Sequence, residues 1–406
     1  MKAAPKICGM IMSKNEKKTM MSIGRRRYAQ IRGKKARGAF LDEFCALTGL
    51  SRKRAIRALK TNTAKRAGRR GRPPKFSAQA ASLLAKAWKL AGKPCGKLLR
   101  PVIATYVGSL RRHGEVDEAA GAEVLRMSAS SMDRLLRRVK PLGGRRWGRH
   151  DSLGEHRRKI GLKQDVWPCN ARALPGWVEV DTVAHCGGSM SGNFMWTLTC
   201  CEVSTQWIEM RPAWNKGAHA VCGALKDAFA AMPFTVLGVN TDNGPEFLNA
   251  HLAREFPWLC PGAVRSRSRP YVKNDNPYVE QKNGHAVRRI LGYGRIDCER
   301  TLDALGEWLC LESLHRNLFR ATFRLLEKSR EGSRWRKRFE KEPKTPAQRL
   351  LDDSGFPEER KERLRALLAT HDPVTLSRRI DAARTNYLRL QNAPSPSPHR
   401  NGGNGV

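Results

Sequence analysis

The stretch Trp177-Val-Glu-Val-Asp-Thr-Val183 is rich in valine, which is typical of a β-strand. Its Asp181 lies among valines, where a carboxylate is costly unless a cation is near. Alternatively, the strand lies at a sheet edge, and Glu179 and Asp181 share a face that meets water. The strand opens a predicted α/β domain over 176–300. We expect its strands at 177–186, 193–201, 206–211, 234–241 and 263–266, with helices at 216–231, 245–255 and 277–292.

Two further carboxylates stand at the ends of predicted elements in this domain. Asp242 closes the apolar run that begins at Phe234 and precedes Asn243-Gly244, and open α/β sheets bind ligands at such strand ends. Glu280 lies in the first turn of the helix that opens at Asn276-Pro277. Taken singly, the first is an ordinary turn aspartate and the second a glutamate that favours the helix dipole.

Together the three carboxylates suit metal-assisted phosphodiester chemistry. Two metal ions about 4 Å apart can clamp the attacking and leaving oxygens at once. Magnesium prefers oxygen ligands and needs only a few carboxylates beside the phosphate oxygens of its substrate. The sequence therefore predicts that Asp181, Asp242 and Glu280, which are 61 and 38 residues apart, bind Mg²⁺ or Mn²⁺, two ions per site.

The charge of the chain predicts a nucleic-acid partner. Its 406 residues include 77 lysines and arginines against 37 acidic residues, a net charge of +40. Such a protein repels itself unless a polyanion compensates, and DNA does so with release of counterions. No apolar run predicts a membrane span and no leader is recognised. Eleven cysteines without a Cys-x-x-Cys pair favour a reducing cytoplasm, where we expect association with the nucleoid.

The first 75 residues carry half of this charge, with 23 lysines and arginines against 3 acidic residues. Residues 1–35 predict a basic, disordered arm. Residues 36–75 predict a helix-turn-helix and a basic linker, with the turn at Thr48-Gly49-Leu50 and Phe40, Leu41, Phe44 and Leu47 facing inward. Its second helix presents cations to DNA, namely Arg52, Lys53, Arg54 and Arg57. An ordinary helical hairpin with a solvated basic face is the alternative. In the linker, Arg72 belongs to a Gly-Arg-Pro sequence of the kind that enters a minor groove; a plain basic linker is the alternative.

The flanking regions read as mostly helical. Residues 76–140 predict a second helical DNA-binding region, and 141–175 a linker that follows a phosphate backbone. Residues 301–390 predict a helical C-terminal region with helices at 302–314, 347–351, 358–369 and 373–390, and a basic loop at 330–338. The tail 391–406 is rich in Pro, Ser, Gly and Asn, which predicts disorder.

Four segments resemble the integrase core of bacterial insertion-sequence transposases, of the DDE superfamily that includes retroviral integrases. They are Val178-Glu-Val-Asp-Thr-Val183, Val239-Asn-Thr-Asp-Asn-Gly-Pro-Glu-Phe247, Ser268-Arg-Pro-Tyr271 and Asn274-Asp-Asn-Pro-Tyr-Val-Glu-Gln-Lys-Asn283. The resemblance implies a ribonuclease H-like core, a mixed five-stranded sheet with helices, in which Asp181, Asp242 and Glu280 are the catalytic metal ligands. It also implies that water and then a 3′-hydroxyl attack DNA, and that a homo-oligomer pairs the terminal repeats of an element and joins them to target DNA.

Other residues near the predicted site are expected to assist. Glu246 is expected to orient the Asp242 turn, and DNA contacts are expected from Arg269, Lys273, Lys282, Asn283 and Arg288, although these could equally form a solvated face. Two other functions remain open from the sequence. One is a sequence-specific DNA-binding regulator with an inactive core, and the other is a nuclease of the same fold that does not join strands.

Overall fold

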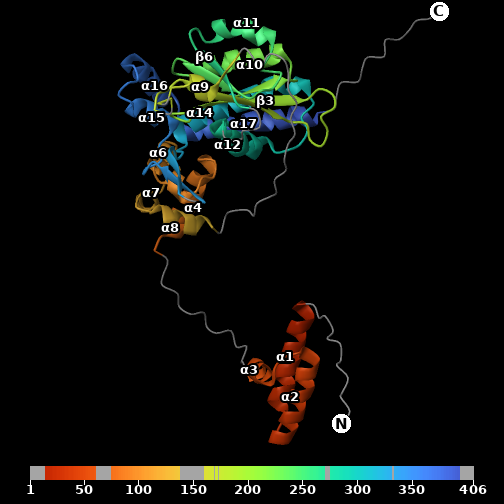
Figure 1. Cartoon of the computed structure of the whole chain (residues 1–406). Helices are drawn as coiled ribbons and strands as arrows, with labels where there is room; N and C mark the ends of the chain where they lie inside the picture. The colour runs from red at the N-terminus through yellow and green to blue at the C-terminus, as the bar shows by residue number, and fades with distance from the viewer. Residues whose placement is uncertain are drawn as a thin grey trace, which may run out of the picture. The chain divides into compact units, whose positions relative to one another are not determined.

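The computed structural model describes residues 14–60, 75–137, 160–168, 170–171, 173–269, 275–331 and 333–393. The chain divides into two units, Met1–Lys75 and Phe76–Val406, and each is described by itself. Figure 1 shows the helices of the first unit in red and the sheet of the second unit in yellow and green. None of the helices in the described ranges is long and apolar enough to cross a membrane.

The first unit is a three-helix cluster. Its helices are α1 (Lys14–Gln30), α2 (Lys34–Thr48) and α3 (Arg52–Lys60). Gly49 ends α2 at φ 68°, a left-handed conformation that glycine adopts without strain, and the chain turns into α3. The small core consists of Leu41, Phe44, Ala55 and Leu59, whereas Leu47, predicted to face inward, is 55% exposed.

The prediction of a disordered arm over 1–35 is wrong for its described part, because residues 14–30 form α1. The helix is polar, but Met21 and Tyr28 pack against the core of α2 and α3. Gly24 lies close against α2, since a Cβ there would lie 2.5 Å from the Phe44 ring. Tertiary packing on a small apolar patch thus overrides the polar composition.

The second unit is built on a six-stranded sheet in the order β1-β6-β5-β2-β3-β4. Strands β2, β3 and β4 pair antiparallel, whereas β5, β6 and β1 add in parallel on the other side of β2. Five of these strands were predicted from the sequence, and the two-residue β1 was not. The bounds are Gly161–Leu162 for β1, Trp177–Ala184 for β2, Met195–Glu202 for β3, Ile208–Trp214 for β4, Gly238–Thr241 for β5 and Val264–Arg267 for β6.

Helices cover both faces of this sheet. In Figure 1, α10 and α11 lie above it, and α12, α14 and α17 lie below. Their apolar residues form one core with the valines of β2, which explains why β2 to β4 are buried on both faces. The bounds are Ala218–Ala230 for α10, Ala250–Leu259 for α11, Pro277–Lys282 for α12, Leu302–Phe319 for α14 and Pro373–Asn392 for α17.

Edge strand β4 is covered by α14. The backbone N–H of Ile208 donates to Asn317 Oδ1 at 2.9 Å, and that of Met210 donates to Ser313 Oγ at 3.0 Å. Asn317 and Ser313 lie fully buried on α14, and their side-chain oxygens accept hydrogen bonds from the strand. An edge strand with open N–H groups is a site for unwanted pairing, and here helix side chains occupy it.

Residues 76–137 form the helices α4 (Ala78–Leu90), α5 (Gly96–Leu99), α6 (Ile103–Arg112), α7 (Glu118–Leu125) and α8 (Ala129–Leu136). They were predicted as a separate region, but their core is continuous with that of the sheet. Buried Tyr106 lies 3.0 Å from Nε2 of His315 on α14, and Ser109 donates to Asp372 at the start of α17. Large apolar residues on α4 and α6 require this cover.

Two other predictions for the flanks are corrected. The linker 141–175 contains β1 and the short helix α9 (Lys163–Val166), because Gly161 and Leu162 add to the sheet edge beside β6. The basic loop 330–338 is part of a hairpin of β7 (Leu325–Glu331) and β8 (Arg334–Phe339) in a region predicted to be helical. Cross-strand pairs such as Glu327 with Arg338 stabilise it where apolar alternation is lacking. The remaining helices agree with the prediction, α15 at Pro346–Asp352 and α16 at Glu358–Thr370.

Candidate active site

Asp181 and Asp242 follow paired residues of two neighbouring parallel strands. Val180 of β2 is the register partner of Thr241, the last residue of β5, and each aspartate is the next residue along. Adjacent strands are about 4.8 Å apart, and residues at one register position point to the same face. Asp181 therefore lies on a central strand, which excludes the edge-strand alternative, and both carboxylates stand at the carboxyl end of β5.

The helix that carries Glu280 is fixed by a buried carboxylate of β2. Glu179, fully buried, accepts hydrogen bonds from the backbone N–H groups of Tyr278 and Val279 at 2.8 and 3.0 Å. Its other oxygen accepts from Lys163 Nζ at 2.5 Å, and that ammonium also donates to the carbonyl of Asp275. Burial raises the pKa of Glu179, an effect that the Lys163 charge opposes. This clamp sets where α12 begins relative to Asp181.

Asn283 connects the same helix to Asp181 directly. Its Nδ2 donates to Asp181 Oδ2 at 2.6 Å, while Asp181 Oδ1 accepts from the backbone N–H of Thr182 at 2.7 Å. Asn283 also opens a π-helical segment, η2 (Asn283–Val287), before α13 (Arg288–Leu291). Single π-helical turns are frequent at functional sites. Glu280 is exposed and lies one helical turn before Asn283, so both are on the same side of the helix.

The carboxylates are not gathered into a complete metal site. Within the described ranges, no three His, Cys, Asp or Glu side chains form a group that could hold a metal ion. Asp181 is engaged by Asn283 and Thr182, and Asp242 Oδ1 accepts from the N–H of Gly244 at 3.0 Å. The register of β2 and β5 therefore brings Asp181 and Asp242 to neighbouring positions, and Glu280 lies on the adjoining helix. The three carboxylates do not form a three-ligand group.

Side chains around the aspartates hold their two loops together. Glu246, 3% exposed, accepts from Thr182 Oγ1 at 3.1 Å and pairs with Lys216 at 2.9 Å, so it ties the Asp242 turn to β2. Asn240 of β5 donates to Ser268 and Asn276, which links the sheet to the start of α12. The roles of Glu179, Lys163 and Asn240 were not predicted from the sequence; the signal for Asn240 is a lone amide in an apolar strand.

The predicted DNA contacts of this unit are partly engaged within the protein. Arg269 pairs with Asp275, and Arg288 donates to the carbonyl of Ala184 at 2.8 Å and lies over the Tyr293 ring. Lys282 donates to Gln206 at 3.3 Å instead of facing solvent. Burial is the main cause that lowers the pKa of Lys282 to about 8, and the charge of Arg316 acts in the same direction. Asn283 binds Asp181, and Lys273 lies outside the described residues.

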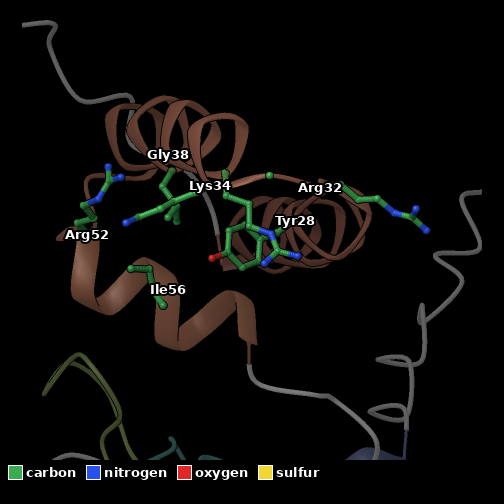
Figure 2. A pocket seen from close by; sticks show the side chains of 9 residues that line it. Tyr28, Arg32, Lys34, Gly38, Arg52 and Ile56 are labelled. Carbon is green, nitrogen blue, oxygen red and sulfur yellow. The ribbon is translucent and has the colours of Figure 1, made fainter.

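The first unit carries the other predicted DNA contacts. Arg52, Lys53, Arg54 and Arg57 are all exposed on α3, and Arg52 pairs with Asp42. A cavity of about 580 Å³ opens beside α3. Figure 2 shows Arg32, Lys34 and Arg52 around it, with Tyr28 and Ile56 as its apolar wall. Arg72 lies outside the described residues.

Comparison with known proteins finds similar proteins both by sequence and by structure. No protein-family profile matches the chain. The catalytic core domain of BIV integrase is similar over 35% of this chain and 83% of that domain, at 17% identity and a TM-score of 0.27. The uncharacterized protein y4rM of Sinorhizobium fredii (strain NBRC 101917 / NGR234) is 36% identical over 310 residues, 74% of this chain and 85% of y4rM. The chain belongs to the same family as y4rM of Sinorhizobium fredii.

Proposed function

We propose that the protein is a DNA transposase that cuts and joins phosphodiester bonds at the ends of a mobile element. The observation that carries this proposal is the placement of Asp181 and Asp242 at neighbouring positions on parallel strands, beside the helix of Glu280. We assign the sheet to the ribonuclease H-like class. Its strand order supports this, with three antiparallel strands and then β5 and β6 in parallel beside β2.

The donor set suits magnesium or manganese. Carboxylate oxygens are the ligands these ions prefer, and magnesium is usually held by one or two carboxylates while phosphate and water fill the other positions. Asp181 and Asp242 supply two such groups, and Glu280 is the third proposed ligand. A bound ion would lower the pKa of an attacking water and stabilise the leaving oxygen. The chain itself orients Asp181 through Asn283 and holds α12 through Glu179.

Double-stranded DNA is the proposed partner, both as element ends and as target. The exposed cations of α3, together with the net charge of +20 over residues 1–75, support a role for the first unit in binding it. Pairing of two element ends requires more than one active site, so we propose a homo-oligomer on DNA. This chemistry belongs in the cytoplasm at the nucleoid.

A second candidate is a DNA-binding regulator with an inactive core. The lack of a three-ligand group among the described side chains favours it. It shares the basic first unit with the transposase and differs only in the chemistry at Asp181, Asp242 and Glu280.

One experiment separates the two. A plasmid carrying the DNA sequences that flank the gene is incubated with the protein and Mg²⁺ or Mn²⁺. If the protein is a transposase, the wild type makes metal-dependent nicks at fixed positions and joined products. Asp242→Asn makes neither product, and Asp227→Asn is as active as the wild type. Asp227 is an exposed aspartate on α10 and serves as the matched control. Binding without cleavage in either metal would favour the regulator, and cleavage without joined products would favour a nuclease.

A further inference from the structure

Helix α14 ends with two arginines that share one acidic partner. Arg316 Nε lies 3.2 Å from Glu312 Oε2, and an Arg320 nitrogen lies 3.8 Å from the same oxygen. The side chains of Arg316 and Arg320 are only 12% and 15% exposed. Guanidinium groups keep their charge in proteins, so one carboxylate faces two buried cations.

Two more cations approach this pair from other elements. Arg289 of α13 is close enough that its charge contributes to lowering the pKa of Arg316 and of Arg320, with burial as the main cause. Lys282 at the end of α12 donates to Gln206, whose amide donates in turn to the carbonyl of Phe323, three residues beyond Arg320. We call Lys282, Arg289, Arg316 and Arg320 the cationic cluster. Glu312 is the one carboxylate paired with it among the described residues, which leaves three positive charges in excess.

The polar partners of the cluster satisfy its N–H groups without neutralising its charge. Arg320 donates to the carbonyl of Gly92 at 3.2 Å, and Arg289 donates to that of Lys93 at 3.3 Å. Lys282 donates to the neutral side chain of Gln206. Gly92 is required for this approach, because its φ is +74° and a Cβ would lie 2.7 Å from the Arg320 guanidinium.

Neighbouring titratable groups do not supply the missing negative charge. Tyr106 is buried and hydrogen-bonded to His315, and burial raises its pKa, so its hydroxyl stays protonated. Burial lowers the pKa of His315 well below its ordinary value, so that ring is neutral. Arg349, a further arginine nearby, has its own carboxylate partner in Glu340. Grouping like charges at low exposure is costly unless an anion joins them.

We propose that the cationic cluster is a binding site for a phosphate group. Paired guanidinium groups match phosphate oxygens with two parallel hydrogen bonds, and a nearby ammonium adds a point charge. The cluster is partly exposed at Arg289, which gives a phosphate a route to Arg316 and Arg320. Lys282 is two residues from Glu280 and therefore on another side of α12, so the site is separate from the carboxylates. The phosphate group bound at this site belongs either to the DNA backbone or to a free phosphate compound.

The first test is thermal unfolding of the full chain in sodium pyrophosphate and in sodium chloride at matched ionic strength. A phosphate site predicts a saturable rise in Tm of a few degrees in pyrophosphate, which Arg316→Gln abolishes. Arg363→Gln is the matched control, because Arg363 is an exposed arginine that also pairs with a glutamate four residues earlier. It must keep the rise, which separates the site from general screening of a basic protein.

The variants also distinguish a ligand site from a structural ion pair. A structural role predicts that Arg316→Gln lowers Tm equally in both salts and leaves the pyrophosphate effect intact, and that outcome overturns the proposal. Arg289→Gln is a second variant, and it should fold normally because Arg289 is exposed. It should lose part of the rise in Tm that pyrophosphate causes in the wild type. An unchanged wild-type Tm in pyrophosphate also overturns the proposal.

Binding of a labelled 30-bp duplex, followed by anisotropy over a range of salt, identifies the source. If the site takes a backbone phosphate, Arg316→Gln weakens binding and lowers the slope of log K against log salt by about one. If it takes a free phosphate compound, DNA affinity stays constant while the pyrophosphate effect is lost. Neither readout depends on cleavage, so an inactive core would leave this proposal standing.

Discussion

Asn283 holds Asp181 by a 2.6 Å hydrogen bond between Nδ2 and Oδ2, across 102 residues of sequence. The amide comes from the first residue of the π-helical turn that follows the helix of Glu280. One side chain thus links the position of the helix to the orientation of the carboxylate. An amide can donate to a carboxylate without adding charge, so it can orient Asp181 and leave its negative charge in place.

Asn283→Ala should therefore raise the Mg²⁺ concentration needed for half-maximal cleavage and reduce the rate by about tenfold, with DNA affinity unchanged. A magnesium titration of the plasmid assay measures both effects. Gln281→Ala, an exposed amide on the same helix, is the control and should behave as wild type. Equal metal curves for wild type and Asn283→Ala would show that the amide does not position Asp181.

Asp181→Asn and Glu280→Gln should each reduce cleavage by about a thousandfold or more, because each removes a proposed metal ligand. DNA binding, measured by anisotropy without metal, should stay within about twofold of wild type. Normal strand joining by either variant would mean that the residue is not a ligand.

Lys163→Met should destabilise the second unit by about 3 kcal/mol, because it leaves the buried Glu179 carboxylate without its cation. Urea unfolding followed by tryptophan fluorescence gives this value. Lys226→Met, at an exposed lysine of α10, should change stability by less than about 0.5 kcal/mol. The double variant Lys163→Met with Glu179→Gln should recover part of the loss; failure to recover would argue against a charge-based role.

Replacing Lys53, Arg54 and Arg57 together by Gln should weaken DNA binding and reduce the salt slope by about three, because three phosphate contacts are lost. Deletion of residues 1–75 should weaken binding further. This unit has its own core, so its removal should leave the thermal unfolding of the second unit unchanged. Unchanged affinity and slope in both proteins would exclude the first unit as a DNA-binding element.

Glu202 predicts a pH dependence of stability. Burial raises its pKa to about 7 from an ordinary 4.5. Because the folded-state pKa is the higher one, its contribution is fully present below about pH 4.5 and is lost as the pH rises through 7. The unfolding free energy of wild type minus that of Glu202→Gln should fall by roughly 3 kcal/mol between about pH 4 and about pH 8. A difference in unfolding free energy that does not change with pH would show that the pKa of Glu202 is not raised.

The sequence predicted the sheet well where strands are buried and apolar, as in Trp177–Ala184 and Met195–Glu202. It failed at β7 and β8, whose charged residues give no alternating apolar face. It also failed at α1, whose helix depends on contacts of Gly24 with Phe44 that local composition does not reveal.

The candidate site was predictable only in part. The position of Asp181 within a buried strand and that of Asp242 at a strand end follow from the sequence pattern. Glu179 was taken as a neighbouring acid, because only the fold brings Tyr278 and Lys163 to it. The inward direction of Lys282 depends on the turn that holds Gln206, which no spacing predicts.

The cover that Asn317 and Ser313 give to strand β4 constrains how copies of the chain can associate. With these two strand amides occupied, a neighbouring molecule is hindered from extending the sheet at that edge. Contacts between copies on this side of the sheet would therefore run through α14, which permits assembly and release without breaking a continuous ladder. The same two side chains would protect a newly made chain from joining others into fibrils before it reaches its target.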